Sequence, residues 1–225
     1  MLITRAQYEI LTPLDGPDIL HNIESYGRVC YKSESRITVE TVTVFIRNLI
    51  KRGHESVLEH MSVSVRIICD RGVSHEIVRH RIASYSQEST RFCNYRKIGV
   101  VFIKPCFLSD CPEGIFTAKK YLEYNFSNRT SCWLRCMLQC EIDYEYLISD
   151  GASPQEARSV LPNSLKTEII VTMNLRQWRH FFKLRAAGVS GKPHPQMLEI
   201  TVPMLAEFKN KIPLVFDDIN PIPEE

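Results

Sequence analysis

The pattern of apolar and polar residues predicts strands in four parts of the chain. In residues 61–69, the side chains of Val63, Val65 and Ile67 fall on one face, and polar residues fall on the other. A period of two residues with one apolar face is typical of a strand that is covered on one side. Together with shorter apolar runs, this pattern predicts strands at residues 2–11, 61–69, 99–103 and 165–173, the first of them at a sheet edge.

Apolar residues at helical spacing predict helices between these strands. Phe45 and Leu49 recur at the helical repeat, and Gly53 ends that helix. His54 and Ser56 follow the glycine, so we expect them on a loop. The expected helices cover residues 16–30, 39–51, 73–81, 116–149, 154–161, 175–185 and 197–211, and residues 91–96 are expected to be extended.

These elements predict an α+β fold, with a central, mostly antiparallel sheet flanked by helices and one long helix over residues 116–149. A chain of 225 residues has the size of one domain. We expect a single domain over residues 1–225, with a folded core at 1–211 and a proline-rich tail at 212–225. No apolar run approaches the roughly 20 residues of a membrane-spanning helix, and no signal peptide is recognisable. We therefore expect a cytoplasmic protein without a membrane segment.

Charge and cysteine content narrow the classes of function. The formal net charge of +2 argues against a surface that attracts nucleic acid over its whole extent, so any basic function must be local. Eight cysteines in a chain without an export signal indicate reduced thiols. Cys132, Cys136 and Cys140 share one side of an expected helix, but their spacing is not that of a zinc site. We interpret them as small buried apolar residues and expect no metal.

Residues 79–91 combine the groups that bind a phosphorylated small molecule. Arg79, His80 and Arg81 open the segment, Arg91 closes it, and hydroxyl and amide side chains lie between them. A guanidinium presents a planar fork of donors that matches phosphate oxygens. The alternative is a cationic face in contact with water.

Arg185 is the second unusual cation. Trp178, Phe181, Phe182 and Arg185 occupy positions i, i+3, i+4 and i+7, so Arg185 continues an apolar stripe. A guanidinium in that place is costly unless a polar or anionic group meets it. Alternatively, its aliphatic part covers the stripe while its charged end reaches water.

The sequence Arg79-His80-Arg81, followed after seven residues by Ser89, resembles the signature of the flavin-dependent thymidylate synthases. The resemblance runs from about residue 53 to residue 208, and two positions depart from it: members often have Asn at Ser86 and Glu at Gln87. The flanking matches are His54-Glu55-Ser56, Glu59-His60, Arg158 in 157–162, Asn174, Arg176, His180 and Arg185 in 174–185, His194-Pro195-Gln196 and Glu199.

The resemblance implies an enzyme that methylates dUMP to dTMP. Methylenetetrahydrofolate is expected to supply the one-carbon unit, and FAD reduced by NADPH the hydride, so the protein supplies binding, orientation and charge. The family assembles as a homotetramer that holds flavin between subunits. The FAD contacts implied are Ser56, Arg79, His80, Arg81, Gln87, Asn174, Arg176 and His180, with His54 on the flavin or folate side.

The same resemblance implies the dUMP contacts. Arg91 and Arg158 are expected at the phosphate, and Arg185 is expected to stabilise negative charge on the uracil, which is worth about 3–4 kcal/mol per donor in comparable sites. We assign Ser89 to binding because its neighbours offer no base that would activate it as a nucleophile. The full expected set is Glu76, Arg79, Gln87, Glu88, Ser89, Thr90, Arg91, Arg158 and Arg185.

Three other functions remain open at this stage. A nucleic-acid-binding module would use the Arg-His-Arg segment, although the low net charge and scattered arginines disfavour it. A flavin- and nucleotide-binding protein without catalytic activity would share the binding residues. A phosphate-ester hydrolase would need a metal cluster or an activated nucleophile, and we find neither motif.

Overall fold

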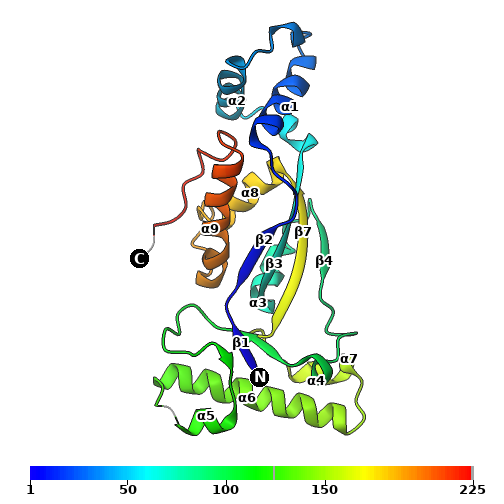
Figure 1. The fold of residues 1–225 in the computed structure, drawn as a ribbon, viewed down its shortest axis with the longest axis vertical. Coiled ribbons are helices and arrows are strands. Elements are labelled where there is room, and N and C mark those ends of the chain that lie inside the picture. Colours follow the sequence, from blue (N-terminus) through cyan, green and yellow to red (C-terminus); the bar gives the residue numbers. More distant parts are fainter. Residues whose placement is uncertain (124, 224–225) are drawn as a thin grey trace. The chain divides into compact units, whose positions relative to one another are not determined.

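The structure, a computed structural model, describes residues 1–123 and 125–223 of the chain (Figure 1). The chain forms two compact units, each built from segments that are distant in sequence. The Arg-His-Arg sequence is divided between them, because Arg79 belongs to unit 1 while His80 and Arg81 belong to unit 2. Unit 1 comprises Met1–Gln7, Ile67–Arg79 and Ser86–Ile169, and unit 2 comprises Tyr8–Arg66, His80–Tyr85 and Ile170–Glu225.

The strands of the described residues form two sheets. The four-stranded sheet has the order β2-β3-β7-β4, and the three-stranded sheet has the order β5-β1-β6. β1 is parallel to β5 and antiparallel to β6. With helices flanking the sheets, the predicted α+β class is confirmed. The strands are β1 (Leu2–Thr4), β2 (Gln7–Ile10), β3 (Ser62–Asp70), β4 (Ser84–Gln87), β5 (Val101–Ile103), β6 (Gly114–Ile115) and β7 (Lys166–Asn174).

The two long strands, β3 and β7, bury alternate side chains as their sequences predict. The last residue of each strand caps the helix that follows. The carboxylate of Asp70 accepts a hydrogen bond from the amide of Val73 at 2.8 Å, and the side-chain oxygen of Asn174 accepts one from the amide of Gln177 at 2.8 Å. Such acceptors are preferred at a helix start because its first amides have no partner within the helix. The helices they begin are α3 (Arg71–Ile77) and α8 (Leu175–Arg185).

The core of unit 2 is built around α8, which packs against α9 and η2. Trp178 of α8 stacks on Phe182 with 5.7 Å between ring centres and lies 5.3 Å from the ring of Phe208. Burial of such aromatic side chains is a main source of stability in a core of this kind. The other helical segments of unit 2 are α1 (Gly16–Val29), η1 (Glu34–Arg36), α2 (Thr41–Lys51), η2 (Glu55–His60) and α9 (Pro195–Lys211).

Unit 1 is organised on α6 (Asn128–Ser149), which contacts α4, α5 and α7. Tyr144 of α6 is buried beside Phe102 and Leu165, and its hydroxyl accepts a hydrogen bond from the amide of Tyr95 at 3.1 Å. None of the helices in residues 1–123 and 125–223 has the length and apolar character needed to cross a membrane. The other helical segments of unit 1 are α4 (Tyr95–Ile98), α5 (Ala118–Glu123), α7 (Pro154–Ala157) and η3 (Arg158–Val160).

The prediction of one long helix over residues 116–149 is wrong. Two helices, α5 and α6, occupy this stretch, and Tyr124 lies outside the described residues. The start of α6 is fixed by Ser127, whose amide donates to the carboxylate of Asp110 at 2.8 Å. The hydroxyl of Ser127 in turn accepts from the amide of Thr130. This cap, which is held by a carboxylate distant in sequence, separates α5 from α6. The apolar residues nevertheless continue at helical spacing across the break.

The predictions were also wrong for several short elements. Residues 84–87 form β4, which was not predicted, and the stretch 91–96, expected to be extended, includes the start of α4, which is capped by Asn94. The single edge strand expected at residues 2–11 is two strands in different sheets. α3 ends at Ile77, so the Arg-His-Arg sequence follows this helix and does not end it. Ser56 lies in the short helix η2 and not on a loop.

Residues 212–219, predicted to begin a peripheral tail, contribute to the core of unit 2. Ile212, Val215, Phe216 and Ile219 are buried, and the ring of Phe216 lies 5.3 Å from that of Phe208 in α9. Three prolines within 212–225 therefore did not indicate an unpacked segment, because the apolar residues between them bury their side chains.

The interpretation of the three helical cysteines as buried residues is also wrong in part. Cys132 and Cys136 are exposed on α6, and Cys140 is half-buried. No disulfide joins the cysteines within residues 1–123 and 125–223.

Candidate functional site

Unit 1 brings together the residues that were predicted to bind a phosphate. Arg158 begins η3 immediately after the capped helix α7, and its Nη1 donates to the hydroxyl of Thr90 at 3.2 Å. Arg91 donates from Nε to the side chain of Gln155 at 3.0 Å. The hydroxyl of Ser89 accepts a hydrogen bond from the amide of Arg91 at 3.2 Å. Arg158 thus contacts the short segment after β4 to which Arg91 belongs, although the two arginines are 67 positions apart in the sequence.

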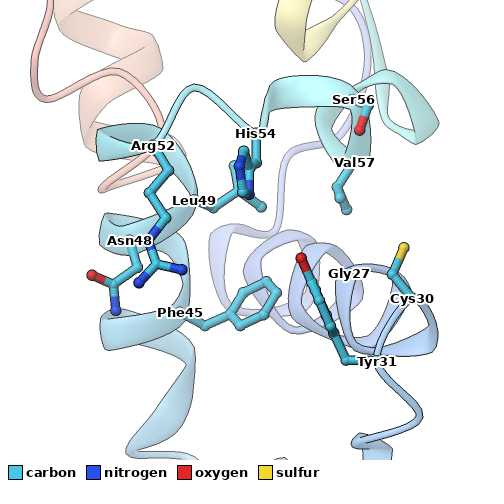
Figure 2. A pocket seen from close by; sticks show the side chains of 10 residues that line it. All are labelled: Gly27, Cys30, Tyr31, Phe45, Asn48, Leu49, Arg52, His54, Ser56 and Val57. Carbon is cyan, nitrogen blue, oxygen red and sulfur yellow. The ribbon is translucent and has the colours of Figure 1, made fainter.

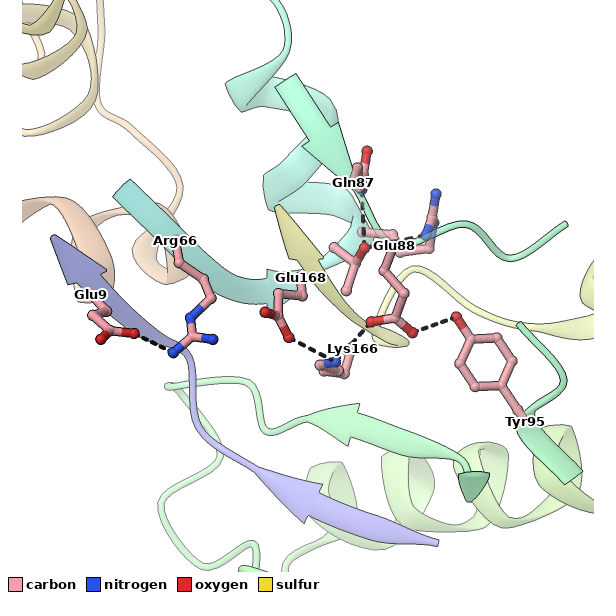
Figure 3. A network of polar contacts seen from close by, with 9 residues as sticks. Glu9, Arg66, Gln87, Glu88, Tyr95, Lys166 and Glu168 are labelled. Atoms are coloured by element: carbon pink, nitrogen blue, oxygen red, sulfur yellow. Dashed lines mark hydrogen bonds and ion pairs between the residues drawn. The ribbon is translucent and has the colours of Figure 1, made fainter. Parts of the chain in front are cut away.

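Glu88 lies in that segment but its carboxylate is occupied within the protein (Figure 3). It accepts hydrogen bonds from the hydroxyl of Tyr95 at 2.9 Å and from Nζ of Lys166 at 2.7 Å. Burial raises the pKa of Tyr95, and the negative charge of Glu88 raises it further, so the phenol keeps its proton and donates. Because a carboxylate would repel a phosphate, its pairing with Lys166 makes the segment more suitable for an anion.

Gln87 is fixed by two buried hydroxyl groups. Its Nε2 donates to the hydroxyl of Ser74 at 3.0 Å and to that of Thr167 at 3.1 Å. The hydroxyl of Ser74 has a single proton, which it donates to the carbonyl of Arg71 at 2.9 Å. Towards position 87 this hydroxyl can therefore only accept, so the amide nitrogen must face it. The departure to Gln at this position agrees with its surroundings, since a carboxylate would have no proton to donate.

In unit 2, residues of α8 line a polar cleft of about 500 Å³. Arg176 and Lys183 supply positive charge, and Glu55 and Glu59 supply negative charge, with Arg176 in an ion pair with Glu59. His180 contributes an imidazole. The complete lining is Glu55, Glu59, Ile82, Asn174, Arg176, Gln177, His180 and Lys183. Three of the residues predicted to contact FAD, namely Asn174, Arg176 and His180, therefore share one cleft.

His54 and Ser56 line a different cleft of unit 2, with a volume of about 430 Å³ (Figure 2). Tyr31 and Phe45 give it aromatic walls, and Arg52 adds a positive charge. Consecutive residues of η2 face the two clefts, because Glu55 lines the first and Ser56 the second. The remaining lining residues are Gly27, Cys30, Asn48, Leu49 and Val57.

His80 and Arg185 meet at the end of α8. Nε of Arg185 donates a hydrogen bond to Nε2 of His80 at 3.2 Å, and the imidazole is only 5% exposed. Burial lowers the pKa of His80 to about 4, and the electrostatic effects of Arg185 and of the neighbouring His180 act in the same direction. Arg185 therefore has a polar partner at the apolar stripe, and this partner is neutral.

The other predicted residues are dispersed. Glu76 and Arg79 belong to unit 1, where Arg79 is exposed just beyond the end of α3, and Arg81 is exposed on the segment 80–85 of unit 2. Their contacts with a ligand remain predictions, as do those of all the residues described above.

Sequence reasoning missed a buried arginine that holds η2 in place. Arg179 of α8 is 1% exposed; it donates from Nε to Glu55 at 3.0 Å and binds both carboxylate oxygens of Asp218 at 2.7 and 2.8 Å. It also contacts the carbonyl of Val215. Burial acts to raise the pKa of Asp218, but the hydrogen bond and charge of Arg179 outweigh it and lower the pKa. An arginine among the charged residues of a helix gives no sign of this role, since its partners are distant in sequence.

Comparisons with known proteins identify the family to which this chain belongs. A family model described as thymidylate synthase complementing protein matches residues 14–214. The flavin-dependent thymidylate synthase of Geobacter sulfurreducens is 34% identical over 212 residues, covering 91% of this chain and 84% of the relative. The enzyme of the same name from Pyrococcus furiosus is 33% identical over 201 residues, covering 89% and 74%.

A solved structure has the same fold. The UMP/dUMP methylase of Streptomyces cacaoi, crystallised with 5-Br UMP, superposes with a TM-score of 0.74 at 19% identity, covering 96% of this chain and 95% of that protein. From the family model and the extent of the identity to these relatives, the chain belongs to the flavin-dependent thymidylate synthase family.

Proposed function

We propose that this protein is an FAD-dependent methyltransferase that converts dUMP to dTMP. The one-carbon donor in this proposal is 5,10-methylenetetrahydrofolate, and NADPH reduces the flavin. Family membership supports the reaction, and the observation that carries it to this chain is the hydrogen bond between Arg158 and Thr90. This hydrogen bond joins Thr90, in the segment after the Arg-His-Arg sequence, to Arg158, which is distant in sequence. A phosphate site needs such a hydroxyl and guanidinium side by side. The homotetramer and the cytoplasmic location expected from the sequence belong to the same proposal.

In the proposed complex, the dUMP phosphate lies against the segment 89–91. Arg91 and Arg158 provide guanidinium groups, and Ser89 provides a hydroxyl, so a dianion is met by charge and by shorter hydrogen bonds. The pairing of Glu88 with Lys166 neutralises the carboxylate that is adjacent in sequence to Ser89. This arrangement supports binding of a phosphate monoester, in accord with the 5-Br UMP and 5-Br dUMP bound to the structural neighbours.

Arg185 is proposed to act on the uracil ring. The ring becomes nucleophilic at C5 when negative charge develops along its amide edge, and a guanidinium aimed at that edge stabilises the charge. Removal of one such donor costs about 3–4 kcal/mol in comparable sites. The aromatic surroundings of the end of α8 lower the local dielectric constant and strengthen the interaction.

The residues of unit 2 suit FAD. Arg176 and Lys183 can meet the pyrophosphate, and Asn174 and His180 add polar groups in the same cleft. The second cleft, with Tyr31 and Phe45 as aromatic walls, suits a flat ring system near His54 and Ser56. FAD, once reduced by NADPH, supplies the hydride, whereas the protein binds and orients the reactants and keeps water away.

The proposal is tested with the purified protein. We expect a bound flavin, visible in the absorption spectrum, that bleaches with NADPH in the presence of dUMP. With methylenetetrahydrofolate added, dTMP should be detected by chromatography with mass spectrometry. A flavin that is bound and reduced without formation of dTMP would support the alternative of a catalytically silent flavin- and nucleotide-binding protein.

A further inference from the structure

We propose that His80 is a positioning residue for Arg185: its imidazole accepts the Nε hydrogen of Arg185 and so sets the direction in which the guanidinium addresses the substrate. The inference deepens the proposed function, because it presupposes that Arg185 contacts the uracil. It assigns His80 a role that is separate from the flavin contact implied by the resemblance.

The hydrogen bond determines the protonation of both groups. An arginine keeps its proton under all conditions in which the protein is folded, so Nε of Arg185 must be the donor. Nε2 of His80, at 3.2 Å, must then carry the free lone pair. The imidazole is therefore neutral, with its proton on Nδ1.

His80 is held so that its lone pair has a fixed direction. Its ring packs edge-on against Phe181 with 4.9 Å between ring centres and against His180 with 5.8 Å. Its backbone carbonyl accepts a hydrogen bond from the hydroxyl of Tyr85. A side chain that is 5% exposed and packed on two rings has lost most of its rotamer freedom on folding. The acceptor is therefore prepared before any ligand binds.

The backbone of Arg185 is anchored as well. Its carbonyl oxygen accepts a hydrogen bond from the hydroxyl of Thr201 in α9 at 2.7 Å. The guanidinium is planar, so the Nε–H and Cδ–Nε bonds together define the plane in which the two terminal nitrogens lie. Fixing the backbone at one end and Nε at the other therefore fixes the orientation of the donor fork. Errors of about 1 Å in such a group reduce rates by about a hundredfold in enzymes.

The charges around His80 favour the neutral state that the role needs. Arg185 and His180, both on α8, are charged or titratable groups that act on the ring, and the Tyr85 hydroxyl donates to the backbone carbonyl of His80. A protonated His80 would lose its acceptor and would repel Arg185. The lowered pKa of about 4 keeps the hydrogen bond intact throughout the neutral range.

A double-mutant cycle on the FAD-loaded enzyme tests the proposal. His80→Phe retains a ring but removes the acceptor, and His80→Gln retains an acceptor close to the position of Nε2. At saturating dUMP, and per bound flavin, we expect His80→Phe to lower kcat by about tenfold to a hundredfold, the usual effect of a lost hydrogen bond to a charged group. His80→Gln should remain within about fivefold of the wild type, by the same principle. In an Arg185→Lys background, His80→Phe should change kcat by less than about twofold, because residues that act together are not additive.

A second measurement is independent of catalysis. Nuclear magnetic resonance of the ligand-free protein can follow exchange of the Nε hydrogen of Arg185, which should be slow in the wild type and in His80→Gln and fast in His80→Phe. If His80→Phe does not fold, His80→Asn replaces it, because its amide is too short to reach Nε of Arg185.

Equal loss of kcat in both backgrounds would overturn the proposal, as would unchanged exchange at Arg185 in the variants without the acceptor. Loss of flavin with an unchanged kcat per bound flavin would also overturn it. If the wild type forms no dTMP, the proposed function fails, whereas the exchange measurement still tests the contact.

Discussion

Several side chains of the candidate site have a single possible hydrogen-bonding pattern. At Gln87, the hydroxyl of Ser74 is already a donor to Arg71, so only a donor at position 87 satisfies it. At His80, the permanent proton of Arg185 determines which imidazole nitrogen accepts. Each case leads to a prediction about stability: a carboxylate at position 87 lacks the donated proton, and a fall in pH adds a proton to His80.

Gln87→Glu should lower the free energy of unfolding by about 1–2 kcal/mol at pH 7, since a carboxylate leaves the buried hydroxyl of Ser74 facing a second acceptor. The loss should shrink as the pH falls towards 5 and below, because a protonated carboxyl regains a donor. Urea denaturation at both pH values measures it. Equal stability of wild type and variant at pH 7 would contradict the assigned orientation of the amide.

The pKa of His80 predicts a specific pH dependence of stability. Burial lowers it to about 4 from the ordinary 6.5, so the unfolded chain takes up this proton first as the pH falls. The stabilisation is complete above pH 6.5 and is lost between 6.5 and 4, by about 3 kcal/mol in total. Other groups titrate in this range, so the difference between wild type and His80→Gln isolates the effect. Parallel pH profiles of the two proteins would disprove the assignment.

At the scale of elements, the sequence predicted those whose signal is local. β3, β7, α1, α2 and α8 follow from alternation, helical spacing and caps within a few residues. β4 was missed because Ser84-Tyr85-Ser86-Gln87 has no apolar face, and its strand conformation comes from pairing in the sheet. The interruption between α5 and α6 was missed because its cap depends on Asp110, 17 positions before Ser127.

The candidate site was predicted by motif and only partly by position. The matched residues identified the segment 87–91 and its link to Arg158, but their supporting partners were not visible in the sequence. Lys166 lies 78 positions from Glu88, and Glu55 lies 124 positions from Arg179. Such pairs form only when the chain is folded, and a single sequence carries no sign of them.

Arg179 connects α8, η2 and the segment after α9, so its removal should loosen all three. Arg179→Ala should reduce the free energy of unfolding by about 3–5 kcal/mol, because two carboxylates lose a buried partner. Hydrogen exchange should increase in η2 and in residues 212–219. As a matched control, Lys119→Ala removes an exposed ion pair with Glu123 and should cost less than about 1 kcal/mol. Equal effects of the two changes would contradict the role of Arg179.

At the scale of the whole molecule, the points to consider are the division of the chain into units and its assembly with other copies. The chain was expected to be a single domain, and its contacts divide into two units. The family membership also leads us to propose assembly into a homotetramer. Four copies of 26.0 kDa give a mass of 104 kDa. We expect this mass from light scattering of the flavin-loaded protein, and a particle of 26.0 kDa that forms dTMP would contradict the proposed assembly.

The two tryptophans of the chain lie one in each unit, Trp133 in unit 1 and Trp178 in unit 2. Their indole nitrogens donate to Ser164 at 3.1 Å and to the carbonyl of Val63 at 3.0 Å, each within its own unit. Replacing either one by Phe leaves an intrinsic fluorophore that senses one unit alone. The emission of the two single-tryptophan proteins during denaturation therefore shows directly whether the units melt in one step or in succession.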